Sequence, residues 1–538
     1  MTKHSAGVLV VGAGLAGLST ALFLSWHGVP CLVVERHRNT SPHPRARGIH
    51  PYSMELMRTV GLEEAIRQAP SAQALAHNHG LIAAESLAGR EFGALREQYF
   101  LDSHPDLDTL TPTGWCLCHQ DEYEPILLAR AREQGAVVRF GTELVSFTDD
   151  GIEGVTAVLR DRDSGDTETV RTRFLVAADG PGSPVRSELG IGFEGSPPLG
   201  HYLNIHFRAD LREALGDRRF IMCYTMNQAL RGALMPLDNA ERWLLHVTFD
   251  PETEPAEGFT TQRCADLVRA AAGLPDLPVE IIGRMPWEAA GRVAESLSAG
   301  NVFLVGDAAH VMPPSGAFGS NTGMADAYQL AWKLAAVLAG YAGPELLETH
   351  HTERWPVGAA TVEQAVLRSR DRPRLTGQEP SAPPNPAIVP DSTVWFGWRL
   401  APGSSEPVWQ PDAQGLPGTR APHVPIERDG IPVSTVDLFG RGFVVLAGAA
   451  GGAWLPAAEA AAGTLGAPLA AYRVGPGDLV DLKDTWPTAY GVDPAGAVLV
   501  RPDGVVGWRS TGPAPSTPDA RTQVLTEALK TVLTHGVA

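Results

Sequence analysis

Hydrophobic residues near the start of the chain form two short runs, within residues 8–11 and 32–36. Runs without alternation are typical of strands buried on both faces of a parallel sheet. A glycine-rich turn follows the first run, and a helical pattern then continues to about Gly28. Residues 7–36 are therefore predicted to form a strand, a helix and a second strand, the unit from which parallel α/β folds are built.

The middle of the chain, from about residue 187 to 285, has a different pattern. Apolar and polar residues alternate in the segments 201–207, 219–225 and 242–250. A period of two predicts strands that bury one face only. Residues 301–340 then return to a strand, a loop and a long helix ending at Gly340. We therefore expect a separate β-sheet inserted into the first unit.

A proline-rich segment separates the last part of the chain. Residues 379–391 are predicted to form a stiff linker. Beyond it, strands are expected within 434–448, a hairpin within 497–509 and an amphipathic helix over 519–535. This part is expected to fold as a second unit.

Composition and charge narrow the class of protein. The chain has 538 residues, of which 44% are hydrophobic and 19% charged, as in soluble proteins of several domains. Its 43 Lys and Arg residues against 61 Asp and Glu give a net charge of −18 without a basic run, so nucleic acid is not an expected partner. The five cysteines lack the spacing of a disulfide framework or zinc site, and we expect no metal.

Two apolar segments resemble targeting or membrane segments only superficially. Glycines interrupt the N-terminal run, and a second apolar run follows at once, so we expect no leader peptide. Residues 442–472 carry little charge but are rich in Ala and Gly, with two prolines and a glutamate, which makes a poor membrane helix. We expect a cytoplasmic protein with no membrane partner.

The turn after the first strand carries the pattern G-x-G-x-x-G, with Gly12, Gly14 and Gly17. The first glycine allows a tight turn, the second lets a pyrophosphate approach the backbone, and the third lets the helix pack on the strand. Glu35, at the end of the second strand, can accept hydrogen bonds from two ribose hydroxyls and would repel a 2′-phosphate. The unit thus predicts binding of a dinucleotide with an unphosphorylated adenosine.

Three stretches together resemble the flavin-dependent aromatic hydroxylases of the p-hydroxybenzoate hydroxylase type: residues 8–36, 174–186 and 302–334. The resemblance covers roughly residues 7–370. In the tail, GTRAPH (418–423) and LVRPDGVVGWR (499–509) are similar to the actinomycete aromatic polyketide branch, which includes aklavinone hydroxylases.

The resemblance implies an α/β fold: a Rossmann-like FAD-binding domain, an inserted β-sheet substrate domain and a C-terminal thioredoxin-like domain. No cysteine follows Cys264, so the last domain has no redox CxxC. The expected boundaries are 1–75, 105–186 and 286–378 for the FAD-binding domain, 76–104 and 187–285 for the substrate-binding domain, 379–391 for the linker and 392–538 for the thioredoxin-like domain.

The resemblance also implies FAD as the cofactor. Carried over motif by motif, the expected FAD contacts are Gly12, Gly14, Gly17, Glu35, Arg36, Arg45, Gln120, Asp179, Arg186, Asp307, Pro314, Gly316, Gly319, Ser320 and Asn321. A helix starting near Asn321 is expected to point its positive end at the flavin. From spacing alone, Arg45 would be either a solvated arginine or an anion contact, and the resemblance favours contact with the cofactor.

The substrate side is less defined by sequence. Expected catalytic residues are Arg45, Tyr224 and Arg372. Tyr224 is a candidate cavity-facing group if its strand faces inward, and otherwise an edge residue. Arg372, with Arg370 and Arg374, would either stabilise a substrate phenolate or form a solvated basic turn. His310 is expected to pack rather than to act as a base.

The function implied is a monooxygenase that uses NAD(P)H as a transient co-substrate and O2 to hydroxylate a polycyclic aromatic polyketide in antibiotic biosynthesis, through a flavin C4a-hydroperoxide. Alternatives are Baeyer–Villiger oxygen insertion, ring cleavage or oxidative rearrangement of a polyketide, and a flavin-binding protein without turnover. We expect a monomer or a homodimer.

Overall fold

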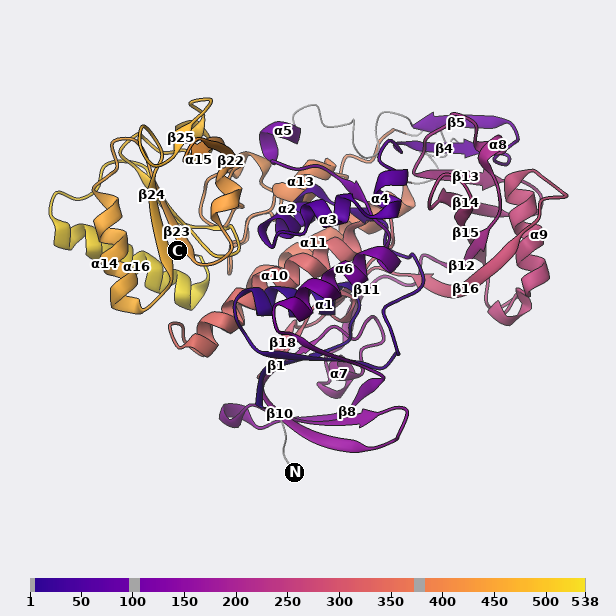
Figure 1. The fold of residues 1–538 in the computed structure, drawn as a ribbon, viewed down its shortest axis with the longest axis horizontal. Coiled ribbons are helices and arrows are strands. Elements are labelled where there is room, and N and C mark those ends of the chain that lie inside the picture. Colours follow the sequence, from indigo (N-terminus) through magenta and orange to yellow (C-terminus); the bar gives the residue numbers. More distant parts are fainter. Residues whose placement is uncertain (1–4, 96–106, 372–382, 538) are drawn as a thin grey trace.

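The computed structural model of the chain describes residues 5–95, 107–371 and 383–537. Figure 1 shows three parts side by side. A central part contains the longest helices and the N-terminal strand β1. Strands from the middle of the chain form a sheet on its right, and the C-terminal unit, in orange and yellow, lies on its left.

The core of the central part is a largely parallel sheet. Its strands are β1 (Ser5–Val11), β2 (Cys31–Glu35), β7 (Val137–Phe140), β8 (Thr142–Asp149), β9 (Val155–Asp161), β10 (Thr167–Ala177), β18 (Ser298–Ala299) and β19 (Val302–Leu304). β1 lies between β2 and β10 and is parallel to both. Leu9 and Val10 are completely buried, which explains why this segment is apolar throughout rather than alternating.

Long helices cover this sheet. They are α1 (Leu15–Trp26), α6 (Gln120–Glu133), α10 (Phe318–Ala339) and α11 (Thr349–Arg370). α1 packs against both α6 and α10, which leaves it buried on nearly all sides. The predicted strand–helix–strand unit over residues 7–36 is therefore present as β1, α1 and β2. The helix expected to start near Asn321 begins three residues earlier, at Phe318, and ends before Gly340 as predicted.

Shorter elements connect the larger ones. The short helices are α2 (Pro51–Thr59), α3 (Glu63–Arg67), α4 (Pro70–Ala74), α5 (Leu107–Leu110) and α7 (Pro184–Glu188). The short strands are β3 (Gly48–Ile49), β6 (Cys116–Leu117), β11 (Phe193–Gly195), β17 (Arg292–Ala294) and β20 (His310–Val311).

A second sheet, here called the mid-chain sheet, has the order β16-β12-β15-β14-β13-β4-β5. Its strands are β4 (Leu81–Ala84), β5 (Glu91–Leu95), β12 (Gly200–Arg208), β13 (Met222–Met226), β14 (Arg231–Pro236), β15 (Arg242–Phe249) and β16 (Glu280–Ala289), with the helices α8 (Arg212–Leu215) and α9 (Thr261–Ala272) beside them. α9 buries its apolar residues against one face of the sheet. The other face is left for the cavity described below.

The C-terminal unit is built on a four-strand sheet in the order β24-β23-β26-β27. Its elements are α13 (Asp391–Phe396), β21 (Pro425–Arg428), β22 (Ile431–Ser434), β23 (Phe443–Ala447), α14 (Trp454–Leu465), β24 (Leu469–Arg473), β25 (Val480–Asp481), α15 (Trp486–Tyr490), β26 (Ala497–Val500), β27 (Val506–Ser510) and α16 (Pro518–His535). β26 and β27 form the expected hairpin, and α16 is the expected last helix.

One predicted strand in this unit is wrong. The first half of 434–448 forms a 3-10 helix over Thr435–Leu438 instead of a strand. The Ser434 side chain accepts a hydrogen bond from the Val436 amide, and Asp437 accepts one from the Ser434 amide. Such local side-chain bonds compete with strand pairing.

Buried charges join the C-terminal unit to the central part. Arg501, from the β26–β27 turn, contacts Glu353 on α11 at 2.6 Å and Asp503 within its own turn. Glu353 also accepts a hydrogen bond from Lys333 on α10 at 2.7 Å. The side chains of these ion pairs are fully buried. Buried ion pairs therefore connect the C-terminal unit to the central part.

The described residues contain neither a candidate membrane helix nor a candidate metal site. None of their helices is both long and apolar enough to cross a membrane. Among the same residues, no group of three or more His, Cys, Asp or Glu side chains is arranged to hold a metal ion.

Candidate active site

A large cavity lies between the central part and the mid-chain sheet. Its volume is about 1530 Å³, above the roughly 300–1,000 Å³ of a typical small-ligand pocket. The turns after β1, β2, β10 and β19 line one end, and strands of the mid-chain sheet line the other. The first end is the carboxyl edge of a parallel sheet, where open α/β folds bind their ligands.

Most residues predicted from the sequence line this cavity. They are Gly12, Gly14, Glu35, Arg36, Arg45, Gln120, Asp179, Tyr224, Asp307, Pro314, Gly316, Gly319 and Ser320. Gly17, Arg186 and Asn321 are not part of its lining. Arg372 and Arg374 lie outside the described residues.

The three glycines of the first turn have different surroundings. Gly12 has a φ of +101°, and a Cβ there would lie 2.4 Å from the carbonyl oxygen of Ala178. A Cβ on Gly17 would lie 1.9 Å from the carbonyl oxygen of Gly12, so Gly17 lets the helix pack on the turn. A Cβ on Gly14 would meet only Glu124, at 3.9 Å. Gly14 therefore leaves open space facing the cavity.

The start of α1 lies beside this open space. Gly14 is the N-cap residue, with no side-chain capping bond and no acidic residue in the first turn. The first amides of a helix lack intrahelical partners, and the helix dipole favours an anion there. A phosphate group fits this arrangement.

Glu35 is placed at the end of β2, beside the same turn. Its Oε2 accepts a hydrogen bond from the Ala13 amide at 2.8 Å, and its Oε1 accepts one from the His37 amide at 2.8 Å. Oε1 also lies 2.6 Å from His37 Nδ1. A carboxylate has about four acceptor positions, so Oε2 can still accept a hydroxyl donor. Glu35 lines the cavity, which suits recognition of a ribose.

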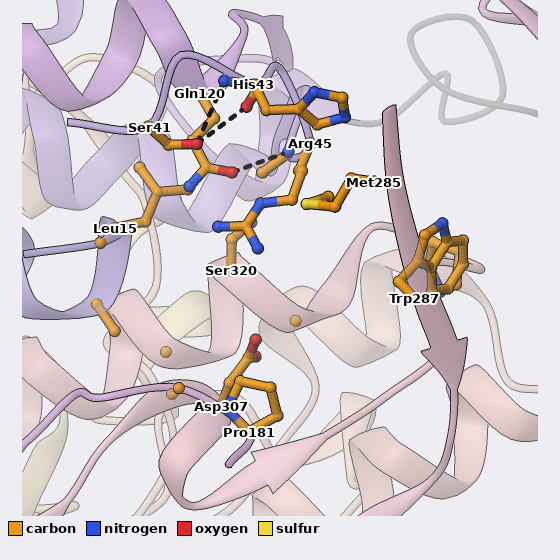
Figure 2. A pocket seen from close by; sticks show the side chains of 18 of the residues that line it. Leu15, Ser41, His43, Arg45, Gln120, Pro181, Met285, Trp287, Asp307 and Ser320 are labelled. Atoms are coloured by element: carbon orange, nitrogen blue, oxygen red, sulfur yellow. Dashed lines mark hydrogen bonds between the residues drawn. The ribbon is translucent and has the colours of Figure 1, made fainter. Parts of the chain in front are cut away.

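The turn after β19 and the start of α10 form the opposite wall. Asp307 extends into the cavity from the turn, facing Arg45 (Figure 2). The surrounding protein raises the pKa of the Asp307 carboxyl by desolvation, against the opposing effects of His310 and Arg45. Ala317, in the left-handed conformation with a φ of 55°, is the N-cap of α10. This helix also begins without a capping side chain or an acid in its first turn.

The first turn of α6 holds the loop that carries Arg45. The Gln120 amide donates to the Ala46 carbonyl at 2.9 Å, and Gln120 Oε1 accepts from the Ala46 amide at 3.3 Å. Glu124 on the same helix accepts from the Ser41 amide and from Gln120 Nε2, at 2.8 and 2.6 Å. Sequence analysis missed Glu124, although it lines the cavity one turn after Gln120.

Arg186 and Asn321 do not line the cavity but form hydrogen bonds to the backbone of turns beside it. Arg186 donates to the carbonyls of Ala308 and Pro181, at 3.1 and 3.2 Å, and its guanidinium lies over the ring of Phe193. Asn321 Oδ1 accepts from the His50 amide at 2.9 Å. Both side chains thus hold the turns around the cavity, and their direct contacts with FAD stay predictions from the sequence.

Asp179 and the arginines in the last turn of α11 have separate roles. Asp179 lines the cavity and accepts from the Val185 amide at 3.2 Å, and burial raises the pKa of its carboxyl. Arg368 is buried and pairs with Asp391 at 2.8 Å. Arg370 is exposed and lines the cavity.

His310 is buried, with its Nε2 2.7 Å from Asp326 Oδ2. Among the described residues, it is absent from the cavity lining. Its packing position is the one expected from the sequence.

Tyr224 faces the cavity from β13. The alternation predicted for this strand is present, since Cys223 and Thr225 are completely buried and point the other way. The strand itself starts at Met222, three residues after the predicted start of the segment.

Sequence analysis missed most other residues of this wall. Among them are Tyr202 on β12, Met222 and Met226 on β13, Met235 on β14, His246 and Thr248 on β15, and Met285 and Trp287 on β16. The only available indication was the alternation within 201–207 and 242–250, which marks a face but not what that face meets.

His43 lies at the edge of the cavity, in the loop before Arg45. Its ring meets the ring of His206 edge to face, with 5.9 Å between ring centres. Burial lowers the pKa of His43 to about 4, and His206 and Arg45 add to this effect. Burial likewise lowers the pKa of His206 to about 4, so both rings are neutral at pH 7.

The residues present fit FAD. Two uncapped helix starts without acidic first turns, an open position above Gly14, and carboxylates at Glu35 and Asp307 form one continuous wall. Anionic phosphates suit the helix starts, and hydroxyl donors suit the carboxylates.

Comparisons with known proteins identify the families that the chain matches. Residues 5–365 match the family described as "FAD binding domain", and residues 414–535 match "Aromatic-ring hydroxylase, C-terminal". A Streptomyces halstedii protein named "Putative polyketide hydroxylase" is 46% identical, covering 99% of this chain and 98% of its own. The 4-methyl-5-nitrocatechol 5-monooxygenase of a Burkholderia species is 44% identical, covering 98% and 97%.

A solved structure has the same fold over the whole chain. The crystal structure of aklavinone-11 hydroxylase with FAD and aklavinone has a TM-score of 0.90 and 39% identity, covering 99% of this chain and 100% of that one. The mixed α/β fold and the resemblance inferred from the sequence are confirmed. The chain belongs to the FAD-binding aromatic-ring hydroxylases and is an FAD-dependent aromatic monooxygenase.

Proposed function

We propose that this enzyme hydroxylates a polycyclic aromatic polyketide in antibiotic biosynthesis, with NAD(P)H as transient electron donor and O2 as oxygen source. The observation that carries the proposal is the continuity of the cavity. One space of about 1530 Å³ joins the glycine turn to a sheet face bearing aromatic and methionine side chains. The named activities of the relatives from Streptomyces and of the aklavinone-11 hydroxylase complex support it.

In this proposal, the residues at the carboxyl edge of the central sheet hold FAD. The amides after Gly12 and Gly14 bind the pyrophosphate, Glu35 the ribose, and Asp307 a hydroxyl of the linking chain. Arg36, Gln120, Asp179, Pro314, Gly316, Gly319 and Ser320 complete the contacts.

Bound and reduced FAD supplies the activation of O2. One oxygen atom of O2 forms a C–O bond with the ring, and the other leaves as water. The two electrons come from NAD(P)H, and the ring proton is lost to solvent. The protein orients the ring against the cofactor and excludes water, because an exposed site would release peroxide instead.

Arg45 and Tyr224 act on the substrate in this scheme. Arg45 extends into the cavity between the two walls, as Figure 2 shows, where its positive charge favours a phenolate over a phenol. A phenolate ring is the more electron-rich nucleophile. Tyr224 offers a hydroxyl from β13 to a polar substituent. Arg372 remains a prediction from the sequence.

A second candidate substrate class is a substituted catechol. The observation that favours it is the Burkholderia relative, whose name describes a single-ring substrate, at 44% identity over nearly the whole chain. Baeyer–Villiger insertion, ring cleavage or rearrangement would use the same cofactor and differ in the product.

The C-terminal unit is proposed to be thioredoxin-like. β23, α14 and the parallel β24 are followed by the antiparallel β26 and β27 and by α16, which is the order of that fold. No cysteine follows Cys264 in the sequence, so the unit cannot carry a dithiol, and we propose that its role is structural or in assembly. The domain boundaries predicted above and a monomeric or homodimeric state complete the proposal.

The test is NAD(P)H consumption in air by the FAD-loaded enzyme, with hydroxyanthraquinones and with 4-methyl-5-nitrocatechol. Stimulated consumption and a hydroxylated polycyclic product carrying one atom from ¹⁸O2 are expected. Turnover of the catechol alone would favour the single-ring class. A lactone product would favour Baeyer–Villiger insertion, and consumption that yields only peroxide with every substrate would contradict the proposal.

A further inference from the structure

We propose that Tyr202 and Trp287 form an aromatic platform on which the planar ring system of the substrate stacks, which makes them specificity-determining residues for substrates of more than one fused ring. This inference rests on the function proposed above, since it names what selects the substrate in the same cavity.

The two rings already form a stack. Their centres are 4.7 Å apart and their planes differ by 18°. Tyr202 on β12 and Trp287 on β16 are direct cross-strand partners, so the sheet register brings them together. Both line the cavity. Offset stacking of parallel rings is a favourable geometry for aromatic pairs.

Neighbouring side chains hold the Trp287 ring in place. Its Nε1 donates to Asn204 Oδ1 at 2.8 Å, and Asn204 is buried. His246 on β15 meets the indole edge to face, with 5.8 Å between ring centres. The plane of the indole is thus set before any ligand arrives, which lowers the entropic cost of binding a flat molecule.

The register explains why this face is continuous. Asn204 on β12 pairs with Met285 on β16 and with His246 on β15. His246 in turn pairs with Ala233 on β14, and Ala233 pairs with Tyr224 on β13. A single row therefore runs from Met285 to Tyr224 along one face, and the small side chain of Ala233 leaves room between His246 and Tyr224.

Methionines extend the apolar surface around the platform. Met222, Met226, Met235 and Met285 all line the cavity. Thioether side chains are flexible and make favourable contacts with aromatic rings. Together with the platform they form a broad apolar floor on the mid-chain sheet side of the cavity. A single ring covers only part of such a floor, whereas three or four fused rings cover the platform and the methionines together.

The experiment measures binding to the oxidised, FAD-loaded enzyme without NAD(P)H, so that no turnover occurs. The probes are 1,8-dihydroxyanthraquinone and 4-methyl-5-nitrocatechol, each followed by equilibrium dialysis. The variants are Trp287→Leu, Trp287→Phe and, as matched control, Phe92→Leu, which removes an aromatic side chain from the same sheet outside the cavity.

The wild-type enzyme is expected to bind the anthraquinone more tightly than the catechol. Trp287→Leu should weaken anthraquinone binding about tenfold, as loss of a stacking partner together with buried area predicts. It should change catechol binding by less than about threefold. Trp287→Phe should retain most of the affinity, and Phe92→Leu should change neither.

Three results would overturn the inference: no preference of the wild type for the anthraquinone, equal effects of Trp287→Leu on both probes, or equal effects of Trp287→Leu and Phe92→Leu. Bound FAD, measured by absorbance, verifies that each variant is folded. Failure of the proposed function would instead be seen as anthraquinone binding with the expected Trp287 dependence but no oxygenated product.

Discussion

The three glycines of the first turn show how one residue type serves different physical purposes. Gly12 is required by its positive φ and by the close carbonyl of Ala178, and Gly17 by contact with Gly12. Gly14 alone faces open space. The fold therefore requires glycine at positions 12 and 17, whereas at position 14 the ligand requires it.

Substitution by alanine separates these purposes. Gly14→Ala should leave the folded protein stable but weaken FAD binding at least tenfold, about 1.4 kcal/mol, because the methyl group occupies the space next to the α1 amides. Gly17→Ala should instead lower the unfolding midpoint of the apoprotein, since its Cβ would overlap the Gly12 carbonyl. Fluorescence titration with FAD and thermal unfolding of both apoproteins measure this. Equal FAD affinities of Gly14→Ala and wild type would contradict it.

Buried histidines predict a pH dependence of stability. Burial lowers the pKa of His350 from 6.5 to about 4, against the raising effect of its hydrogen bond to the Leu304 carbonyl. The unfolded chain therefore takes up protons first as the pH falls. The free energy of unfolding should decrease from about pH 6.5 down to about pH 4 and be fully retained above this window.

Urea unfolding midpoints at pH 7.5 and 5.5 test this dependence. In His350→Gln the midpoint should fall less between the two pH values than in the wild type. His77→Gln, at an exposed position, is the control, and its midpoint should fall between the two pH values as much as the wild-type midpoint does. An equal fall in His350→Gln would show that the His350 ring does not contribute to the pH dependence.

At the scale of elements, α10 connects the cavity to the rest of the molecule. Its first turn lines the cavity, and its middle carries Asp326. Asp326 accepts hydrogen bonds from His310 at 2.7 Å, from Arg354 on α11 at 2.9 Å and from the Gly306 amide at 3.2 Å. Burial opposes ionisation of Asp326, but His310 and Arg354 outweigh it and hold the pKa of this carboxyl below its usual range. The Gly306–Asp307 turn is thereby tied to two helices.

Removing the charge of Asp326 should loosen that turn. Asp326→Asn leaves Arg354 buried without its anion, a change that typically costs about 3–5 kcal/mol of stability. FAD affinity should also fall, because Asp307 is no longer held. Glu363→Gln, an exposed position on the same α11, should change neither quantity. Urea unfolding measures the loss of stability, and FAD titration measures the loss of affinity. A wild-type FAD affinity in Asp326→Asn would contradict a role of Asp326 in positioning Asp307.

At the scale of the whole molecule, the C-terminal unit is docked by ions rather than by apolar packing alone. Arg501, Glu353, Lys333 and Asp503 are buried together. Burial opposes the charge on Glu353, but Arg501 and Lys333 outweigh it and lower the pKa of Glu353 to about 2. Buried ions tolerate little change, because removing one partner leaves another uncompensated.

Arg501→Met should therefore uncouple the two parts. The unfolding midpoint should decrease, and unfolding should separate into two transitions because the C-terminal unit loses its joint with α11. Lys530→Met, which removes an exposed charge from α16, is the control. Differential scanning calorimetry measures both. A single transition at the wild-type temperature in Arg501→Met would contradict this role.

Local patterns along the chain were enough for the strand–helix–strand unit, the glycine turn with Glu35, the mid-chain strands and the last helix, since each depends on periodicity or backbone sterics within a few residues. The same local reasoning failed at Thr435–Leu438, where two side-chain bonds to the backbone outweigh the strand preference.

Tertiary structure decided what these elements meet. Arg186 and Asn321 match family motifs, yet they hold carbonyl and amide groups of turns behind the cavity. Trp287 and Tyr202 carry no motif, yet the register of β12 and β16 stacks them in the cavity. Whether a side chain points into a site depends on contacts between residues far apart in the chain, which no local pattern records. Chain topology brings Arg501 to Glu353, 148 positions away, for the same reason.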